Sequence, residues 1–396
     1  MGDTPWLSII GLGEDGPEGL PIASRSALWQ AEVIMGPPRH LRLLGEVTTE
    51  TVEWPVPFSD GIDVLMAMKG RKVAVLASGD PFWFGAGTAL TRLLEPGEWR
   101  AFPGPSCFGL TAARLGWPME QVDCLGLHAK PLSRLRPALA RGARLIVTLR
   151  DGAAVTALGR YLTEVGFGSS TVWVLEALGG PRERVTSARA DALDGAFGHP
   201  VVAAIEVGDG PALPCVPGLP DDRFDHDGQI TKRPVRALTL SALAPRPGEM
   251  LWDIGGGSGS VAIEWLLAHP ANRAISIEAD ATRADRLVAN AAALGVDRLA
   301  CVTGRAPDAL DGLDVPDAVF VGGGLSATLL ERLMQLAPGT RIVANAVTLE
   351  SEAMLVAARA AHGGDLMRID LAQAKPLGTR TGWAASYPIV QWAVVL

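Results

Sequence analysis

The sequence has no long uninterrupted apolar stretch. No apolar run reaches the roughly 18 residues that a membrane-spanning helix requires, so no contact with a membrane is expected. The first residues, Met1–Trp6, lack a basic region followed by an apolar core, and no secretion signal is predicted. These absences favour a cytoplasmic protein.

Cysteine is scarce and histidine is scattered. The four cysteines form no C-x-x-C pair, which argues against a zinc site and against a disulfide framework. Five histidines also show no metal-ligand spacing: His40, His128, His199, His269 and His362. No metal is predicted.

An excess of basic residues is absent as well. The chain has 43 acidic against 35 basic residues, and the net charge of −8 disfavours a nucleic-acid substrate, because neutralising phosphates needs a basic surface. Charged residues make up 20% of the chain and the mean hydropathy is +0.22, as in a packed protein rather than a disordered one. A length of 396 residues favours two or three domains.

One glycine-rich stretch suggests a chemistry. A short apolar strand, Met250–Ile254, carries one acid at Asp253, is followed by a turn rich in glycine, and restarts as a helix at Val261. Glycine in such a turn allows a positive φ and lets a ligand approach the backbone closely. A strand, a glycine turn and a helix N-terminus together indicate the nucleotide-binding corner of a doubly wound α/β sheet.

The spacing of these glycines indicates which nucleotide is bound. A dinucleotide fingerprint starting at Gly255 would need glycine in place of Ser260. The pattern over 255–259 is instead Gly-x-Gly-x-Gly, which resembles the first motif of the S-adenosylmethionine (SAM) methyltransferases. The next strand, Arg273–Glu278, ends in an acid about twenty residues on, where Glu278 would hydrogen-bond ribose hydroxyls.

The N-terminal half also alternates strands and helices. Short buried strands are predicted at Trp6–Ile10 and Lys72–Ala77, and a helix over Ser24–Met35. Four further strands are predicted at Val122–Leu127, Arg144–Leu149, Thr171–Glu176 and Val201–Val207. Glycine- and proline-rich turns follow several strands, at the ends where open α/β sheets bind their ligands.

Over residues 6–207 this half resembles the tetrapyrrole (corrin and porphyrin) methylase family. The resemblance is carried by three turns, each after a strand: Gly11-Leu-Gly13 with Gly16-Pro17, Ser78-Gly-Asp-Pro81 with Gly85, and Pro103-Gly104 with Ser106. It implies an N-terminal two-lobed α/β tetrapyrrole methylase fold with SAM in the cleft between the lobes.

The same resemblance assigns residues to that cleft. Gly79, Asp80 and Ser106 would line the cofactor site, while Gly11 and Gly13 would keep the first turn open to the substrate. Taken without the resemblance, Asp80 also fits a plain turn-stabilising role before a proline.

Residues 208–221 differ in amino-acid composition from the rest of the chain. Closely spaced prolines and glycines interrupt any periodicity there, which indicates a linker. The predicted domains are therefore 1–207 and 222–396. A Gly-x-x-Thr-Lys stretch over 228–232 then leads into a helix predicted from Pro234 to Ala242.

The second domain resembles the decarboxylating precorrin methyltransferase domain of cobalamin biosynthesis. The resemblance rests on the stretches 228–232, 253–259, 304–308 and 321–324, together with Glu278. It implies a C-terminal Rossmann-like class I SAM methyltransferase fold whose SAM contacts are Thr231, Gly255, Gly256, Gly257, Ser258, Gly259, Glu278 and Ala306. Relatives usually carry an acid where Arg305 stands, so the backbone at Ala306 would hold adenine.

The pairing of these two domains implies action on one macrocycle. Enzymes with this pair of domains methylate a precorrin at carbons 5 and 15 and remove carbon dioxide from the ring C acetate on carbon 12, in cobalamin (vitamin B12) biosynthesis. The C-terminal domain would then methylate carbon 15 and decarboxylate, leaving carbon 5 to the N-terminal domain. Both families usually associate, so a homo-oligomer is expected.

A tetrapyrrole substrate carries many carboxylate arms, which cations and helix N-termini would hold. Lys232, Arg233 and Arg236 cluster beside the cofactor corner, and Gly323 and Arg380 are further predicted substrate contacts.

The predicted methyl transfer requires few catalytic side chains. Methyl transfer from a sulfonium mainly needs orientation, so no Ser-His-Asp arrangement is expected. Candidate proton handlers are His226, Asn345 and Glu350. The near-neutral pKa of histidine would suit His226 for this role, although a lone loop histidine is more often a surface residue.

Three alternatives stay open from the residues. The C-terminal fold could belong to a nicotinamide-dependent oxidoreductase, or to a SAM enzyme acting on RNA or protein. The N-terminal half could also bind the tetrapyrrole without catalysis, leaving a single methyl-transfer site.

Overall fold

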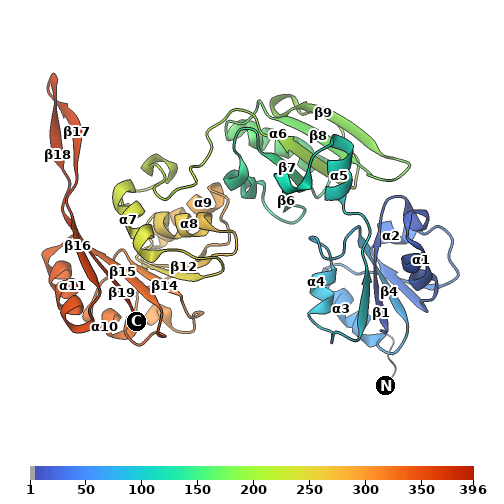
Figure 1. The fold of residues 1–396 in the computed structure, drawn as a ribbon, viewed down its shortest axis with the longest axis horizontal. Coiled ribbons are helices and arrows are strands. Elements are labelled where there is room, and N and C mark those ends of the chain that lie inside the picture. Colours follow the sequence, from blue (N-terminus) through green and yellow to red (C-terminus); the bar gives the residue numbers. More distant parts are fainter. Residues whose placement is uncertain (1–4) are drawn as a thin grey trace. The chain divides into compact units, whose positions relative to one another are not determined.

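The computed structural model describes residues 5–396, which form two compact units (Figure 1). One unit runs to Leu132 and continues over Ala138–Pro211, and the other comprises Ser133–Pro137 and Ala212–Leu396. The domain limits predicted from the sequence stay predictions, and the predicted start at residue 1 lies outside the described residues.

The N-terminal unit begins with a five-stranded, all-parallel sheet of order β3-β2-β4-β1-β5. Its strands are β1 (Leu7–Leu12), β2 (Val33–Gly36), β3 (Glu50–Glu53), β4 (Val73–Ser78) and β5 (Trp99–Phe102). The inner strands β1, β2 and β4 are mostly apolar and buried on both faces, as parallel strands covered by helices must be, whereas the edge strand β3 is largely exposed. One face packs on α1 (Ile22–Trp29) and α2 (Pro38–Leu43), the other on α3 (Phe58–Ala67) and α4 (Gly87–Thr91).

The helix predicted over Ser24–Met35 is wrong in its second half. The helix ends at Trp29, and Val33–Gly36 forms strand β2 in the interior of the sheet. Val33, Ile34 and Met35 are 0% exposed. A short apolar run with β-branched residues fits a strand buried on both faces as well as it fits a helix, and sheet pairing decides between them here.

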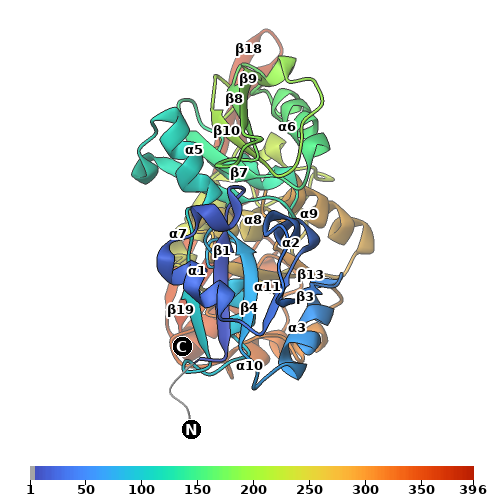
Figure 2. The same cartoon turned by 90° about the vertical axis from the view of Figure 1, so that its right-hand side faces the viewer.

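A second sheet completes the N-terminal unit. Its order is β6-β7-β10-β8-β9, and only the β6–β7 pair is parallel. The strands are β6 (Val122–Gly126), β7 (Arg144–Thr148), β8 (Thr171–Glu176), β9 (Arg184–Arg189) and β10 (Val201–Glu206), with helices α5 (Cys107–Leu115) and α6 (Gly152–Glu164). Figure 2 shows the two sheets of this unit as separate lobes, the first in blue and the second in green.

The C-terminal unit is built on a seven-stranded sheet of order β13-β12-β11-β14-β15-β19-β16. Its strands are β11 (Met250–Ile254), β12 (Arg273–Glu278), β13 (Ala300–Thr303), β14 (Ala318–Val321), β15 (Arg341–Ala346), β16 (Asp365–Ile369) and β19 (Ile389–Val395). The first five strands in the order are parallel, and β19 is antiparallel to both neighbours. The strand order reverses direction between β11 and β14, which opens a crevice at their carboxyl ends.

Helices cover both faces of this sheet. One core contains side chains from α7 (Arg233–Leu243), α8 (Ser260–Ala268) and α9 (Ala281–Ala293), and the other from α10 (Ala327–Leu333) and α11 (Leu349–His362). This is the Rossmann-like arrangement predicted from the glycine turn.

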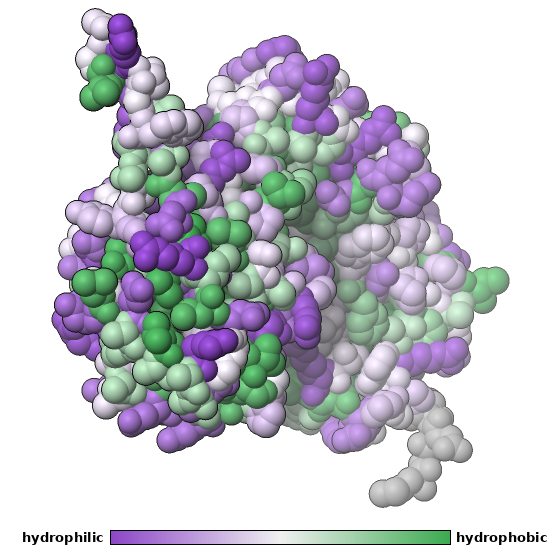
Figure 3. All heavy atoms as spheres, turned by 60° about the vertical axis from the view of Figure 1, so that its left-hand side comes forward, coloured by the Kyte–Doolittle hydropathy of each residue, from purple (hydrophilic) through white to green (hydrophobic). Residues whose placement is uncertain are grey.

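A two-stranded hairpin extends from the C-terminal unit (Figures 1 and 3). It consists of β17 (Ala372–Leu377) and β18 (Arg380–Ala385), which form a two-stranded sheet with each other. Trp383 and Leu377 are exposed on it, at 80% and 71%. On the face shown in Figure 3, hydrophobic and hydrophilic residues are interspersed.

Candidate functional site

The glycine turn after β11 adopts the backbone that the sequence predicts. Gly255, Gly257 and Gly259 have φ values of +76°, +56° and +76°, a region that other residues rarely occupy. A Cβ built on Gly255 would lie 2.7 Å from the amide nitrogen of Gly323. Glycine at 255 therefore lets the turns after β11 and β14 meet at the crevice.

This crevice is a cavity of about 570 Å³ in the C-terminal unit. It brings together most of the residues predicted for this domain's site: Thr231, Lys232, Gly255, Gly256, Gly257, Ser258, Glu278, Ala306, Gly323 and Asn345. Arg305 lies on the same wall, beside Ala306.

Glu278 is a buried acid at the end of β12 and faces the turn. Its Oε2 accepts a hydrogen bond from the Gly257 N–H at 2.8 Å, and its Oε1 accepts one from the Asp280 N–H at 2.9 Å. Each oxygen keeps a lone pair, so the carboxylate can accept further hydrogen bonds from a ligand while holding the turn.

Asp253 lies beneath the turn and is only 1% exposed. Its Oδ2 accepts a hydrogen bond from the Ser276 hydroxyl at 3.0 Å. Burial raises the pKa of Asp253 to about 6; the Ser276 hydrogen bond opposes this shift, and the nearby charge of Glu278 contributes to it.

Several predicted residues lie outside the cavity lining. Gly259 faces Leu287, which a Cβ would approach to 2.7 Å, so this glycine serves the packing of the turn. The His226 side chain is half-buried, and its Nδ1 accepts a hydrogen bond from the Gly228 N–H at 3.0 Å. Arg380 lies on the exposed hairpin.

Two further predicted residues begin helices. Arg233 is an exposed residue whose backbone N–H donates to Asp221 at 3.0 Å. Glu350 is exposed in the first turn of α11, where its own backbone N–H and then the Thr348 hydroxyl hold the pKa of its carboxyl below its usual value. A carboxylate with a lowered pKa is a weaker base.

Arg236 does not line the cavity, and its charge is already paired with carboxylates of the protein. It is fully buried, and its guanidinium donates to Glu264 at 2.6 Å and to Asp221 at 3.1 Å. It also donates to the Thr231 carbonyl and lies over the Phe224 ring, 4.8 Å from its centroid. Its role is to fasten the segment before α7 to the core, so the predicted substrate role for Arg236 is wrong.

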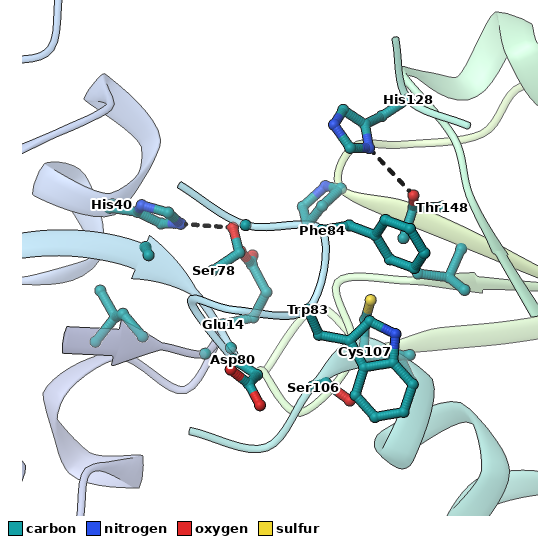
Figure 4. Close-up of a pocket in the computed structure, with 18 of the residues that line it drawn as sticks. Glu14, His40, Ser78, Asp80, Trp83, Phe84, Ser106, Cys107, His128 and Thr148 are labelled. Atoms are coloured by element: carbon teal, nitrogen blue, oxygen red, sulfur yellow. Dashed lines mark hydrogen bonds between the residues drawn. The ribbon is translucent and has the colours of Figure 1, made fainter. Parts of the chain in front are cut away.

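A second cavity, of about 500 Å³, lies between the two lobes of the N-terminal unit (Figure 4). Gly13, Gly79, Asp80 and Ser106 line it, as the tetrapyrrole methylase resemblance implies. Gly11 does not, because a Cβ there would lie 1.7 Å from the Gly79 carbonyl oxygen.

The predicted cleft residues also have structural tasks. Asp80 Oδ1 accepts a hydrogen bond from the Phe82 N–H at 2.9 Å, as the turn-stabilising interpretation expects. Ser106 caps α5, where its hydroxyl accepts from the Gly109 N–H at 3.1 Å. Neither contact prevents these residues from lining a ligand site.

The N-terminal cavity contains polar residues that the sequence did not point to. Glu14 is 7% exposed and pairs with Arg39 and, at 2.9 Å, with Arg182 from the other lobe. His40 lies 3.0 Å from the Ser78 hydroxyl (Figure 4). Burial and then the charge of Arg39 lower the pKa of His40 to about 3, so its ring is neutral. These residues are far apart in the sequence, and no motif joins them.

Aromatic side chains form one wall of this cavity. Trp83 stacks on Phe108 with centroids 5.3 Å apart, and Phe84 packs on the same ring at 5.7 Å. Both rings are about half exposed, at 41% and 52%. Trp83 therefore offers a flat surface to the cavity, whereas Trp252 is buried in the sheet.

None of the helices within residues 5–396 combines the length and the apolar character needed to cross a bilayer. Within the same residues, no three or more His, Cys, Asp or Glu side chains are grouped as metal ligands.

Comparison with known families defines the class of this chain. Residues 7–194 match the family described as tetrapyrrole (corrin/porphyrin) methylases, and residues 222–396 match the family described as the precorrin methyltransferase domain. The chain thus joins two methyltransferase domains of unrelated fold, as predicted.

Relatives of full length identify the family more closely. The chain is 47% identical to a precorrin-6Y C(5,15)-methyltransferase (decarboxylating) of a Sinorhizobium species, over 98% of this chain and 96% of the relative. It is 42% identical to the Mycobacterium tuberculosis protein of the same name, over 98% and 99%. The chain belongs to this family, and the predicted family, fold class and enzyme class are confirmed.

Among solved structures, the chain is similar to the C-terminal domain of the precorrin-6Y C5,15-methyltransferase from Rhodobacter capsulatus. The identity is 57%, the match covers 46% of this chain and all of that domain, and the TM-score is 0.45.

Proposed function

We propose that this chain methylates a precorrin macrocycle at carbons 5 and 15, with SAM as methyl donor, and decarboxylates the acetate on carbon 12, in cobalamin biosynthesis. The observation that carries the proposal is the presence of two separate cavities, one in each unit, each bordered by a glycine turn at strand ends. Full-length similarity to enzymes named for two methylations and a decarboxylation supports it.

The residues of the C-terminal cavity fit SAM. The Ser258 hydroxyl is buried and has no hydrogen-bond partner within residues 5–396. Glu278 has lone pairs left for ribose hydroxyls, and a Cβ built on Gly257 would come no closer than 3.8 Å to another atom. Bound there, SAM would supply an electrophilic methyl group, and Thr231 and Ala306 would complete the contacts.

The N-terminal cavity would hold a second SAM against Gly79, Asp80 and Ser106. Gly79 has a positive φ of +53°, and a Cβ built on it would lie 2.7 Å from the Pro105 carbonyl oxygen. Two backbone segments therefore approach closely, as is needed where a ligand is gripped mainly by main-chain groups.

The protein's contribution to methyl transfer is orientation. The electron-rich meso carbon would itself be the nucleophile toward the methyl group that bound SAM supplies, so the enzyme needs no nucleophilic side chain. Lys232 lies at the C-terminal cavity without an ion-pair partner in the described part of the chain, and would bind a carboxylate arm of the macrocycle.

The C-terminal cavity also suits the decarboxylation. Val347 and Ile389 give it an apolar side next to Asn345. An apolar wall disfavours a carboxylate more than the dispersed charge of the transition state, which favours loss of carbon dioxide there. We assign the carbon 15 methylation and the decarboxylation to this unit, and the carbon 5 methylation to the N-terminal unit.

Blocking each cavity separately tests this assignment. Gly79→Val and Gly255→Val each place a branched side chain at a positive φ against an opposing turn. With precorrin substrate and SAM, mass spectrometry should find one methyl group added by either variant and two by the unaltered chain. If Gly79→Val still adds two, the N-terminal unit only binds the macrocycle.

We further infer a cytoplasmic homo-oligomer. Size-exclusion chromatography with light scattering would give the number of chains, and a monomeric mass would contradict this inference.

A further inference from the structure

The side-chain amide of Asn345 is held by residues from two other elements. Asn345 on β15 lies directly opposite Gln391 on the antiparallel strand β19, so the two side chains share a face of the sheet. Helix α7 packs on β15 and supplies Thr239. Gln391 and Thr239 are buried, whereas Asn345 is half-buried and lines the cavity.

Three hydrogen bonds link the side chains of Asn345, Gln391 and Thr239 to one another. Gln391 Nε2 donates to Asn345 Oδ1 at 2.9 Å and to Thr239 Oγ1 at 3.0 Å. Asn345 Nδ2 donates to Thr239 Oγ1 at 2.9 Å. Both hydrogens of the Gln391 amide and both lone pairs of the Thr239 hydroxyl are therefore in use.

This pattern fixes the orientation of the Asn345 amide. If Asn345 alone rotated by 180°, its NH2 group would face the NH2 group of Gln391. If both amides rotated, the single hydroxyl hydrogen of Thr239 would face two acceptor oxygens. Only the observed orientation satisfies all three partners, and a buried network of this kind is costly to leave half satisfied.

The network leaves Asn345 one N–H and one oxygen lone pair. An amide does not titrate near neutral pH, so Asn345 can bind and orient a group but cannot act as a base. Residues two positions along each strand point to the same face. Ile389 lies two positions from Gln391 on β19, and Val347 follows the end of β15; both line the cavity with Asn345, which gives one hydrogen-bond donor beside two apolar side chains.

We propose that Asn345, Val347 and Ile389 form the subsite for the acetate arm that loses carbon dioxide, and that Thr239 and Gln391 are positioning residues that aim the Asn345 N–H at its carboxylate. This inference rests on the function proposed above. The carbon–carbon bond to the carboxylate breaks, and its electron pair passes into the positively charged, methylated macrocycle. Carbon dioxide leaves, and the remaining methylene carbon takes a proton from solvent to become a methyl group.

The test uses the full chain with precorrin substrate and saturating SAM. Gln391→Leu and Thr239→Val should slow loss of carbon dioxide on the order of ten-fold or more, because an oriented hydrogen bond to a charged group is lost. Product should accumulate that carries both methyl groups and retains the carboxyl group. Thr239→Ser keeps the hydroxyl and should decarboxylate at nearly the unaltered rate.

The matched control is Gln335→Leu, an exposed glutamine after α10 that should behave as the unaltered chain does. If Gln391→Leu unfolds the C-terminal unit, the variant Gln391→Glu is used instead to test whether residue 391 positions Asn345. This nearly isosteric change puts an oxygen opposite Asn345 Oδ1, which turns the amide and should slow decarboxylation in a folded protein.

Two outcomes would overturn the inference. Decarboxylation at the unaltered rate by Gln391→Leu and Thr239→Val would show that these residues do not position Asn345. The same result for Asn345→Ala would show that there is no acetate subsite. Failure of the unaltered chain to add methyl groups would instead refute the proposed function, and carbon 5 methylation in every variant serves as the internal check.

Discussion

The carboxylate of Glu278 accepts a 2.8 Å hydrogen bond from the backbone N–H of Gly257 and so ties the end of β12 to the glycine turn after β11. One buried side chain thereby positions both edges of the proposed cofactor corner. Gly257 has a positive φ of +56°, which glycine adopts without strain.

Replacing Glu278 with alanine should weaken binding of S-adenosylhomocysteine to the C-terminal unit by about 10- to 100-fold, since hydrogen bonds to a charged group are lost. Binding to the N-terminal unit should not change. Calorimetric titration measures both, with Glu331→Ala on exposed α10 as the control. Equal affinities in the two variants would remove Glu278 from the site.

Gly11→Ala should destabilise the N-terminal unit by about 1–3 kcal/mol or more, because its Cβ would overlap the Gly79 carbonyl oxygen. Gly97→Ala is the matched control, since a Cβ there meets nothing within 4 Å and its φ is not positive. Urea unfolding followed by circular dichroism compares them. Equal midpoints for the two variants would contradict the close packing of these turns.

Asp253 should make the C-terminal unit less stable as pH rises through the range from about 4 to 6. Its folded-state pKa of about 6 lies above the ordinary aspartate pKa of 3.8, so the folded state holds more protons than the unfolded state in this range. The loss amounts to about 3 kcal/mol and is complete above the folded pKa.

The variant Asp253→Asn lacks this titration. Its stability relative to the unaltered chain should therefore rise between pH 4 and pH 6.5, as measured by urea unfolding at each pH. A difference that stays constant over that range would show that Asp253 titrates normally.

Arg236→Met should destabilise the C-terminal unit by about 3–5 kcal/mol, because Glu264 would remain buried without its cation. Glu264 also accepts from the N–H groups of Gly218 and Leu219, so the segment before α7 should loosen and become sensitive to proteases. Arg233→Met, which changes an exposed neighbour, is the control. Similar unfolding midpoints would argue against this fastening role.

The sequence was most informative where a local pattern determines the structure. Strands β8, β11 and β12 have the predicted bounds, because each is a short apolar run between clear turn residues. The glycine turn over 255–259 was predictable for the same reason, since a positive φ requires glycine.

Features that depend on distant residues could not be predicted. β2 looks like the end of a helix until its pairing with β3 and β4 is known. Gln391 joins the site only because the last strand inserts between β15 and β16, and Glu14 meets Arg182 only because two lobes close on each other. No spacing in the sequence brings these residues together.

The number of SAM-type ligands bound by one chain tests the central claim most directly. Calorimetric titration of the full chain with S-adenosylhomocysteine should give two equivalents, and one equivalent for either Gly79→Val or Gly255→Val. A single equivalent in the unaltered chain, abolished by only one of these substitutions, would contradict an enzyme with two methyl-transfer sites.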